Sequence, residues 1–327
     1  MTAADAAVPP APPVKPAAWE WYIPIYFWAG GIAAGSWLAF TAEQLAGDGD
    51  SAVVRAGRYL ALGGVLGGTV LLIVDLGRPD RFLNMLRIVR ARSTMSLGAW
   101  GLALFGGLTG VAGLLQAAED GWLGRQPALA RLSRGSAGRA LHLLGLPAAL
   151  FVGGYTGVLL ETSSTPAWSR QARRLGPLFL ASAVSSGLAA VDAVVGARNG
   201  VRPKVRRRLA RAGAAALAAE LALELRSHAA ARTLPSIRRD GLLAQTARAV
   251  TIGAGIAAPL ALALGRSRAR RNGRARLGDA LVLAGSLGLR FLVTREGLRS
   301  ARTPADTWQL TGRTTARLQR EGACAPR

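Results

Sequence analysis

The chain has 327 residues and a formal net charge of +23, yet half of its residues are hydrophobic. Its arginines do not form one basic face but cluster between apolar runs of about twenty residues, which is typical of membrane helices joined by charged loops. This pattern argues against a basic ribosomal or chromatin protein, and we expect no nucleic-acid partner. The single cysteine, Cys324, cannot supply a disulfide framework, an iron–sulfur cluster or a Cys-based zinc site.

Eight apolar stretches predict an all-α polytopic protein of the cell membrane with about eight transmembrane helices. In chain order they lie at 22–46, 53–76, 96–118, 138–161, 174–196, 206–226, 242–265 and 276–296. We expect a disordered Ala/Pro-rich tail at 1–18, one transmembrane domain at 19–300 and a C-terminal tail at 301–327. Ser96 is the expected N-cap of the third helix. The short loops on the two faces carry nearly equal numbers of Lys and Arg, so the positive-inside rule leaves the orientation open.

The sixth stretch is the weakest of the eight. Arg211, Glu220 and Glu224 interrupt its run of Ala and Leu, and each charge near the middle of a membrane helix costs about 2.5–3.5 kcal/mol on insertion scales. It inserts if the glutamates face protein or water rather than lipid. If it does not insert, the chain crosses the membrane seven times.

The two halves of the chain differ in composition. The first half carries six of the eight tryptophans and a dense set of glycines four residues apart, a spacing that lets helix backbones approach closely in lipid. The pairs are Gly31 with Gly35, Gly63 with Gly67, Gly64 with Gly68, Gly106 with Gly110, and Gly153 with Gly157. We therefore expect a tight N-terminal four-helix bundle followed by four Ala/Leu-rich helices. The alternative is that glycine is simply common in membrane helices.

Asp75 ends a long apolar run, and Arg78 follows it within reach on a helical turn. An acid and a base at membrane depth are costly unless they have a task or a partner. One interpretation is a pair that handles protons or orients a ligand, and the other is an interfacial ion pair that fixes the helix end.

Tyr155 lies among glycines in the fourth helix, and a buried tyrosine hydroxyl needs a partner. A quinone, with a flat ring and two carbonyl oxygens, suits such a donor in an apolar cleft. The alternative, favoured by the residue alone, is a tyrosine packed on glycine and bonded to a neighbouring helix. Trp21 and its aromatic neighbours at the start of the first helix are typical of an interfacial belt.

Asp192, Glu220 and Glu224 are acids inside expected spans of the second half of the chain. They are candidates for a proton path, and the alternative is pairing with arginines near the helix ends (Arg198, Arg211 or Arg226). Haem is disfavoured, because one of the two histidines, His142, lies near a helix start and the other, His228, beyond a helix end, so neither predicts a bis-histidine site.

Several segments, in order, resemble the NrfD family of membrane subunits from polysulfide, nitrite and related reductases. They are YFWAGGIAAG at 26–35, DLGRP at 75–79, RFLNM at 81–85, MSLGAW at 95–100, YTGVLL at 155–160 and PAW at 166–168, with a weaker LRF at 289–291. The resemblance implies an eight-helix subunit that exchanges electrons with membrane quinone, for which menaquinone is the expected type. It also implies an iron–sulfur partner, linked to a molybdopterin-type or other catalytic subunit, and no haem, metal or cluster in this chain.

The resemblance further implies roles for particular residues. Tyr155 matches the position expected for a quinone-binding tyrosine, and Asp75 with Arg78 matches the acid–arginine motif near the quinone pocket. Asn84, in the RFLNM segment, and Trp21 are further candidates for quinone contact. Two departures stand out: Thr94 replaces a common proline, and the first helix begins with aromatics where a His or Asn would help to bind quinone.

Two rival functions are also compatible with the sequence. A transporter or ion-translocating protein would explain the acids of the second half, but it predicts inverted repeats and broken helices, and the sequence has no internal repeat. A redox-inactive membrane anchor is the other alternative.

Overall fold

The structure is a computed structural model that describes residues 14–46, 51–76, 92–124, 126–196, 201–239, 241–264 and 271–310, with residues 84, 86, 87, 89 and 90 between the second and third ranges; of 271–274 only the backbone is described. All regular elements in this part of the chain are helices. The long ones are α1 (Tyr22–Leu45), α2 (Ser51–Asp75), α3 (Thr94–Glu119), α5 (Ser136–Glu161), α7 (Leu175–Gly196), α8 (Pro203–Ala231) and α12 (Arg271–Ala301). A further rod is built from α10 (Leu242–Ile252), the π-helix η2 (Gly253–Ala257) and α11 (Ala258–Leu264).

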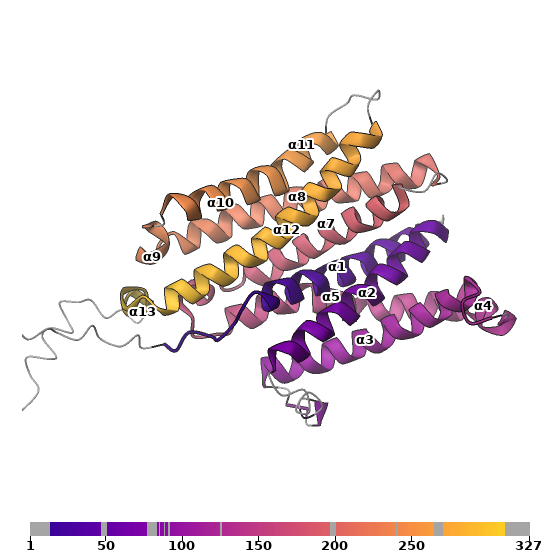
Figure 1. The fold of residues 1–327 in the computed structure, drawn as a ribbon, viewed down its shortest axis with the longest axis horizontal. Coiled ribbons are helices and arrows are strands. Elements are labelled where there is room, and N and C mark those ends of the chain that lie inside the picture. The colour runs from indigo at the N-terminus through magenta and orange to yellow at the C-terminus, as the bar shows by residue number, and fades with distance from the viewer. Residues whose placement is uncertain are drawn as a thin grey trace, which may run out of the picture.

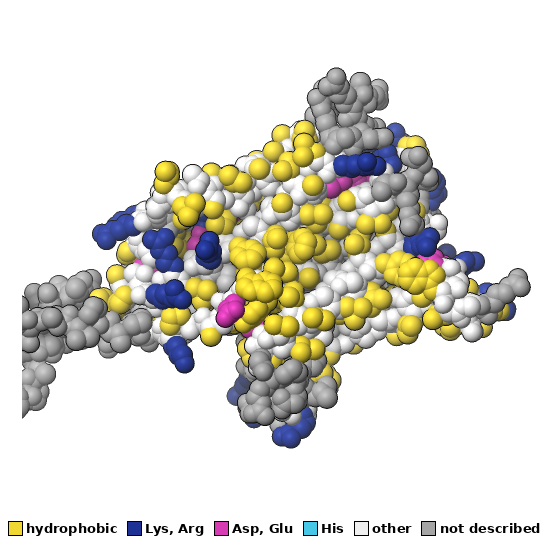
Figure 2. Space-filling model, viewed as in Figure 1, with side chains coloured by type: hydrophobic (Ala, Val, Ile, Leu, Met, Phe, Trp, Pro, Cys, Tyr) yellow, Lys and Arg dark blue, Asp and Glu magenta, His cyan; other side chains and the backbone are white. Residues whose placement is uncertain are grey.

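Short helices join these rods at the two ends of the molecule. They are α4 (Pro127–Arg134), α6 (Pro166–Arg170), α9 (Pro235–Arg238) and α13 (Pro304–Leu310). The long helices run side by side as a bundle, with α4 at one end and α9 and α13 at the other (Figure 1). Lys and Arg side chains gather toward both ends of the visible face, while apolar side chains occupy its middle (Figure 2).

Two groups of helices share α1 and α7 at the centre of the bundle. Helices α1, α2, α3 and α5 pack together on one side. On the other side α8 and α12 pack on α7, and the α10–α11 rod packs on α12 and α8. The N-terminal four-helix bundle is therefore observed, and its core contains Trp37, Phe40 and Phe105, all fully buried.

Glycine lets α1 and α7 touch at their centre. A Cβ atom on Gly35 would lie 1.8 Å from the backbone oxygen of Ala183, and one on Gly187 would lie 2.2 Å from the carbonyl carbon of Gly35. The expected close packing is thus present here, but it is not general: a Cβ atom on Gly63 or Gly67 would meet nothing within 4 Å.

Among the described residues, seven helices are long and apolar enough to cross a membrane, and α8 is not one of them. Even so, α8 has 29 residues, about 44 Å at the usual rise per residue, and it lies along α7 from one end of the bundle to the other (Figure 1). Its Glu220 and Glu224 are buried against neighbouring helices. The chain is thus an all-α, multi-pass membrane protein in which seven described helices are apolar enough to span and one polar helix, α8, packs along α7 with its glutamates turned inward.

Three local expectations were wrong. Helix α3 starts two residues earlier than expected, so Ser93 is its N-cap and accepts a hydrogen bond from the amide of Ser96. Helix α8 continues to Ala231, which puts His228 inside the helix. The seventh expected span is interrupted by η2, a wider helical turn that sequence periodicity does not reveal.

Candidate functional site

Tyr155 lies near the C-terminal end of α5 and faces the start of α3. Its hydroxyl donates to the backbone oxygen of Thr94 at 2.7 Å, and its ring stacks on Phe151 at 5.1 Å between centroids. The ring fits only because position 98 is glycine, since a Cβ atom there would lie 2.0 Å from the hydroxyl oxygen. The tyrosine is half-buried. Its proton is donated to α3, but its oxygen can still accept a hydrogen bond.

Asp75 ends α2 at the same end of the bundle. It is half-buried, and its carboxylate lies within hydrogen-bonding range of the Tyr22 hydroxyl on the first turn of α1. Trp21 packs edge-on against Tyr22 at 5.7 Å, and 59% of its surface is exposed. Asn84 is also exposed, while Arg78 lies outside the described residues.

Tyr26 connects these two groups. Sequence reasoning placed it in an aromatic belt and at the start of the first family-like segment, but not in the site. It lies one helical turn after Tyr22, within electrostatic range of Tyr155. Its ring packs over Gly68 of α2, where a Cβ atom would lie 3.3 Å from it. The i, i+4 spacing of Tyr22 and Tyr26 was the available signal. Asp75, Tyr22, Tyr26 and Tyr155 therefore form a line of polar groups across α2, α1 and α5, called here the tyrosine–aspartate end.

A second polar cluster lies at the opposite end of the same four helices. Arg58, only 2% exposed, donates to His142 at 3.1 Å, and to Gln116 at 3.0 Å. Its other acceptors are Ser133 at 2.8 Å and Glu119 at 3.1 Å. The cluster ties α2, α3, α4 and α5 together, so it accounts for His142 as a packed and hydrogen-bonded residue of the core.

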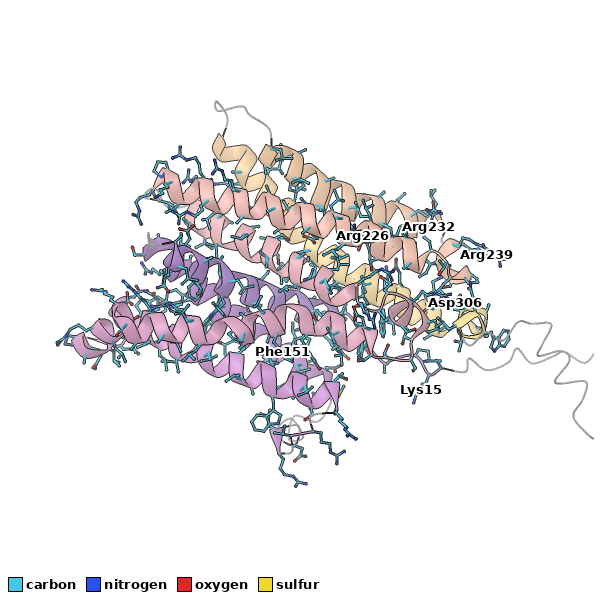
Figure 3. All side chains as sticks on the ribbon, turned by 180° about the vertical axis from the view of Figure 1, so that it is seen from behind. Lys15, Phe151, Arg226, Arg232, Arg239 and Asp306 are labelled. Carbon is cyan, nitrogen blue, oxygen red and sulfur yellow. The ribbon has the colours of Figure 1, made fainter. Side chains whose placement is uncertain are left out.

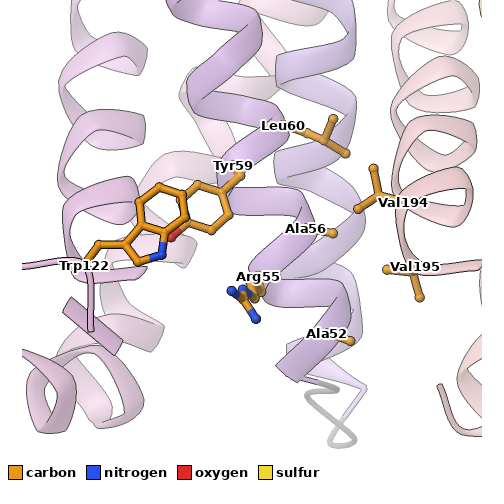
Figure 4. Close-up of a pocket in the computed structure, with 8 residues that line it drawn as sticks. All are labelled: Ala52, Arg55, Ala56, Tyr59, Leu60, Trp122, Val194 and Val195. Atoms are coloured by element: carbon orange, nitrogen blue, oxygen red, sulfur yellow. The ribbon is translucent and has the colours of Figure 1, made fainter. Parts of the chain in front are cut away.

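A pocket of about 280 Å³ lies beside this second cluster, between α2 and α7 (Figure 4). Tyr59 stacks on Trp122 at its rim, and both Tyr59 and Arg55 bind Asp120, at 2.7 and 2.9 Å. The pocket is smaller than most ligand sites, which enclose about 300–1,000 Å³. It does not coincide with the tyrosine–aspartate end.

Glu220 lies in a buried network that joins α8, α7 and α12. It accepts a hydrogen bond from Ser185 at 2.6 Å and lies within range of Ser182. Arg290 of α12, 1% exposed, donates to Ser182 and sits 4.9 Å from the ring centre of Phe179. The buried carboxylate and the buried guanidinium thus share Ser182 as a common neighbour.

Glu224 continues this network by one turn of α8. It is 4% exposed and interacts electrostatically with Arg248 of α10, which forms an ion pair with Glu296 of α12. The cations near the two glutamates are therefore Arg290 and Arg248, both from the last third of the chain, and not the expected Arg211 or Arg226, which are exposed. Arg198 itself lies outside the described residues.

Asp192 is not part of this network. It lies two turns of α7 beyond Ser185, near Arg206 of α8 and Asp279 of α12. The sequence had not singled out Asp279 as a candidate. Between the two polar groups lies a layer of four buried apolar side chains, called here the apolar layer: Ala189, Leu217, Ile256 and Val282. Within the described residues, no three His, Cys, Asp or Glu side chains gather as a metal site would require.

Comparisons with known proteins agree with this architecture. The family model "Polysulphide reductase, NrfD" matches residues 13–300. The C subunit of the polysulfide reductase of Wolinella succinogenes is 32% identical over 182 residues, which is 52% of this chain and 56% of that protein. Protein NrfD of Escherichia coli is 32% identical over 187 residues, 52% of this chain and 57% of that protein, so the alignments span little more than half of these relatives. Because the family match covers the whole helical bundle, from the first span to the end of α12, the chain belongs to the NrfD family of membrane subunits.

Proposed function

We propose that this chain exchanges electrons between membrane quinone, most simply menaquinone, and a docked iron–sulfur subunit of an oxidoreductase complex. The observation that carries the proposal is the tyrosine–aspartate end, where Tyr155, Tyr26 and the Tyr22–Asp75 pair converge from three helices. An apolar bundle that gathers three phenols and one carboxylate at its edge suits a ligand with a flat ring and two polar oxygens. Membership of a family named for polysulfide reductase supports the same role.

The hydrogen bonds of Tyr155 favour a quinol as the bound form. Its proton is donated to Thr94, so its oxygen is available as an acceptor for a quinol hydroxyl. Asp75 would take the proton that leaves the quinol, with Tyr22 holding the carboxylate in place and Arg78, on the following turn, tuning its charge. Oxidation of one quinol releases two electrons to the partner's cluster and two protons. Trp21 directly precedes Tyr22, and Asn84 follows Asp75 by nine residues. Both are exposed, and they would cover the ring of the quinol.

The same end of the bundle is the proposed docking face for the partner. Lys15, Arg232 and Arg239 project from it, close to α9 and α13 (Figure 3). A cationic surface at this end of the bundle suits an acidic iron–sulfur protein, because complementary charge steers and orients association. A molybdopterin-type catalytic subunit would then complete the electron path.

The Tyr155→Phe substitution tests the site. It removes the hydroxyl but keeps the ring on Phe151, so the complex should assemble while quinol oxidation falls by about 10²-fold or more, in the range expected when a positioned catalytic group is lost. Tyr59→Phe is the matched control, because Tyr59 also bonds through its hydroxyl but lies at the opposite end. Equal turnover in the two variants would remove Tyr155 from the site. Purification of the native complex without quinone or partner subunits would instead favour a redox-inactive anchor.

A further inference from the structure

The seam between α7, α8 and α12 contains charged groups that the quinone site does not use. On one side of the apolar layer lie Asp192, Asp279 and Arg206. On the other side lie the buried groups Glu220, Arg290, Glu224 and Arg248, which lead to the half-buried Glu296 near the end of α12. Ionisable groups are rare at this depth because burying them is costly, and they commonly mark ion or proton pathways.

Two further donors in the same seam lack a partner. Nε of Arg290 and Oγ1 of Thr294 are buried without a hydrogen bond among the described residues, and the Thr294 side chain is only 2% exposed. Thr294 lies one turn of α12 beyond Arg290, on the way to Glu296. Buried polar groups of this kind are commonly satisfied by internal water, so this turn of α12 is where the proposed path would hold water.

The apolar layer separates the two polar groups in this conformation. Along α7, the distance from Ser185 to Asp192 is about 10 Å at the usual rise per residue, and Asp279 and Ser286 are equally far apart on α12. Direct proton transfer requires heavy atoms within about 2.6–3.2 Å, or a bridging water. Ala189 and Val282 occupy the gap on these two helices.

The layer includes a residue held by an irregular helix. Ile256, 1% exposed, belongs to the π-helix η2, and π turns inside α-helices occur frequently at functional sites. At the same level Gly255 touches Gly285 of α12, where a Cβ atom on Gly255 would lie 2.4 Å from the Gly285 Cα. A return of this turn to α-helical geometry would rotate Ile256 relative to α12, so η2 is the element of the layer whose rearrangement would open it.

We propose that α7, α8 and α12 form a proton path across the membrane, closed here by the apolar layer and opened by a rearrangement of η2. Protons pass between carboxylates and internal water, with Arg290 and Arg248 holding the acids in register. The proton path is an activity separate from electron exchange, but as a pump it rests on the proposed function, because quinol oxidation would supply its energy.

A passive measurement tests the path without any quinol chemistry. The complex is reconstituted in potassium-loaded vesicles with an internal pH dye, and valinomycin imposes a membrane potential. Val282→Thr keeps the side-chain shape but adds a hydroxyl to the layer; one added hydrogen bond for a bridging water should raise proton conductance by about tenfold. Val250→Thr is the control, because Val250 is 64% exposed on the same rod as Ile256. Ala189→Ser adds a hydroxyl from α7 and serves if Val282→Thr does not assemble.

Adding Glu220→Gln to the leaking variant should return its conductance to the wild-type level. Equal conductance in the Val282→Thr and Val250→Thr vesicles, or a leak that Glu220→Gln leaves unchanged, would overturn the path. During turnover, the wild-type complex should move more than one proton per electron, and Glu220→Gln should reduce the ratio to the one proton released by quinol chemistry. A Val282→Thr complex that leaks, together with a wild-type complex that does not oxidise quinol, would contradict the proposed function and leave the path standing.

Discussion

Removing the buried guanidinium of Arg290 should destabilise the bundle strongly. Its guanidinium is 1% exposed, donates to Ser182 and to the Ser286 carbonyl at 3.1 Å, and lies over Phe179. Arg290→Met keeps most of the apolar volume but leaves Glu220 as a buried carboxylate without its nearest cation. Loss of one member of a buried charge pair costs about 3–5 kcal/mol, and Glu220→Gln should cost a similar amount because it strands the guanidinium.

The double variant distinguishes charge pairing from simple loss of contacts. Replacing both members of a buried pair by neutral groups is often neutral, or even stabilising by about 1–4 kcal/mol. Arg290→Met with Glu220→Gln should therefore be much more stable than the sum of the two single effects, by a coupling energy of about 3 kcal/mol or more. The measurement is the free energy of unfolding of the purified complex in mixed micelles, for the wild type, the two single variants and the double variant. Additive effects would show that the two groups do not stabilise each other.

Three further substitutions test the packing described above. Gly35→Ala should cost several kcal/mol, because its Cβ atom would overlap the α7 backbone, whereas Gly63→Ala should be close to neutral in the same unfolding assay. Gly98→Ala should lower quinol oxidation by displacing the tyrosine opposite it, whereas Gly107→Ala on the same helix, which meets nothing within 4 Å, should leave turnover unchanged. Arg58→Met should leave the buried side chains of Gln116 and Ser133 without their shared donor and lower stability by about 1–3 kcal/mol, visible as a lower melting temperature of the complex.

The positions of the helices could be predicted because bilayer thickness alone sets the length of an apolar run. The expected stretch 22–46 corresponds to α1 at Tyr22–Leu45, and 138–161 to α5 at Ser136–Glu161. The short helices α6 and α9 were missed, since each has only a few residues and begins with a proline, a pattern typical of a loop.

The contacts of the candidate site were less predictable, because they depend on which faces of distant helices meet. Asp75 and Tyr155 stand out by residue type, and both lie at one end of the bundle. Tyr22 as the partner of Asp75 required the first helix to pack on α2, and Arg290 as the neighbour of Glu220 required α12 to reach α7 and α8. No local pattern encodes either pairing, and Arg290 appeared in the sequence only within a weak three-residue match.

Helix α8 raises the question of how a polar segment stays inside a membrane bundle. Its glutamates would be costly in lipid, but the structure places Arg290 and Arg248 beside them, so their burial depends on helices that follow α8 in the chain. A chain that ends before α10 should therefore lose the crossing, because both arginines are then absent. Single cysteines at positions 202 and 233, introduced with Cys324 replaced by serine, should be labelled from opposite sides of the membrane in the full chain and from the same side in the shortened one. Labelling from opposite sides in both would show that α8 inserts through its own hydrophobicity, and the charged network would then be a consequence of insertion and not its cause.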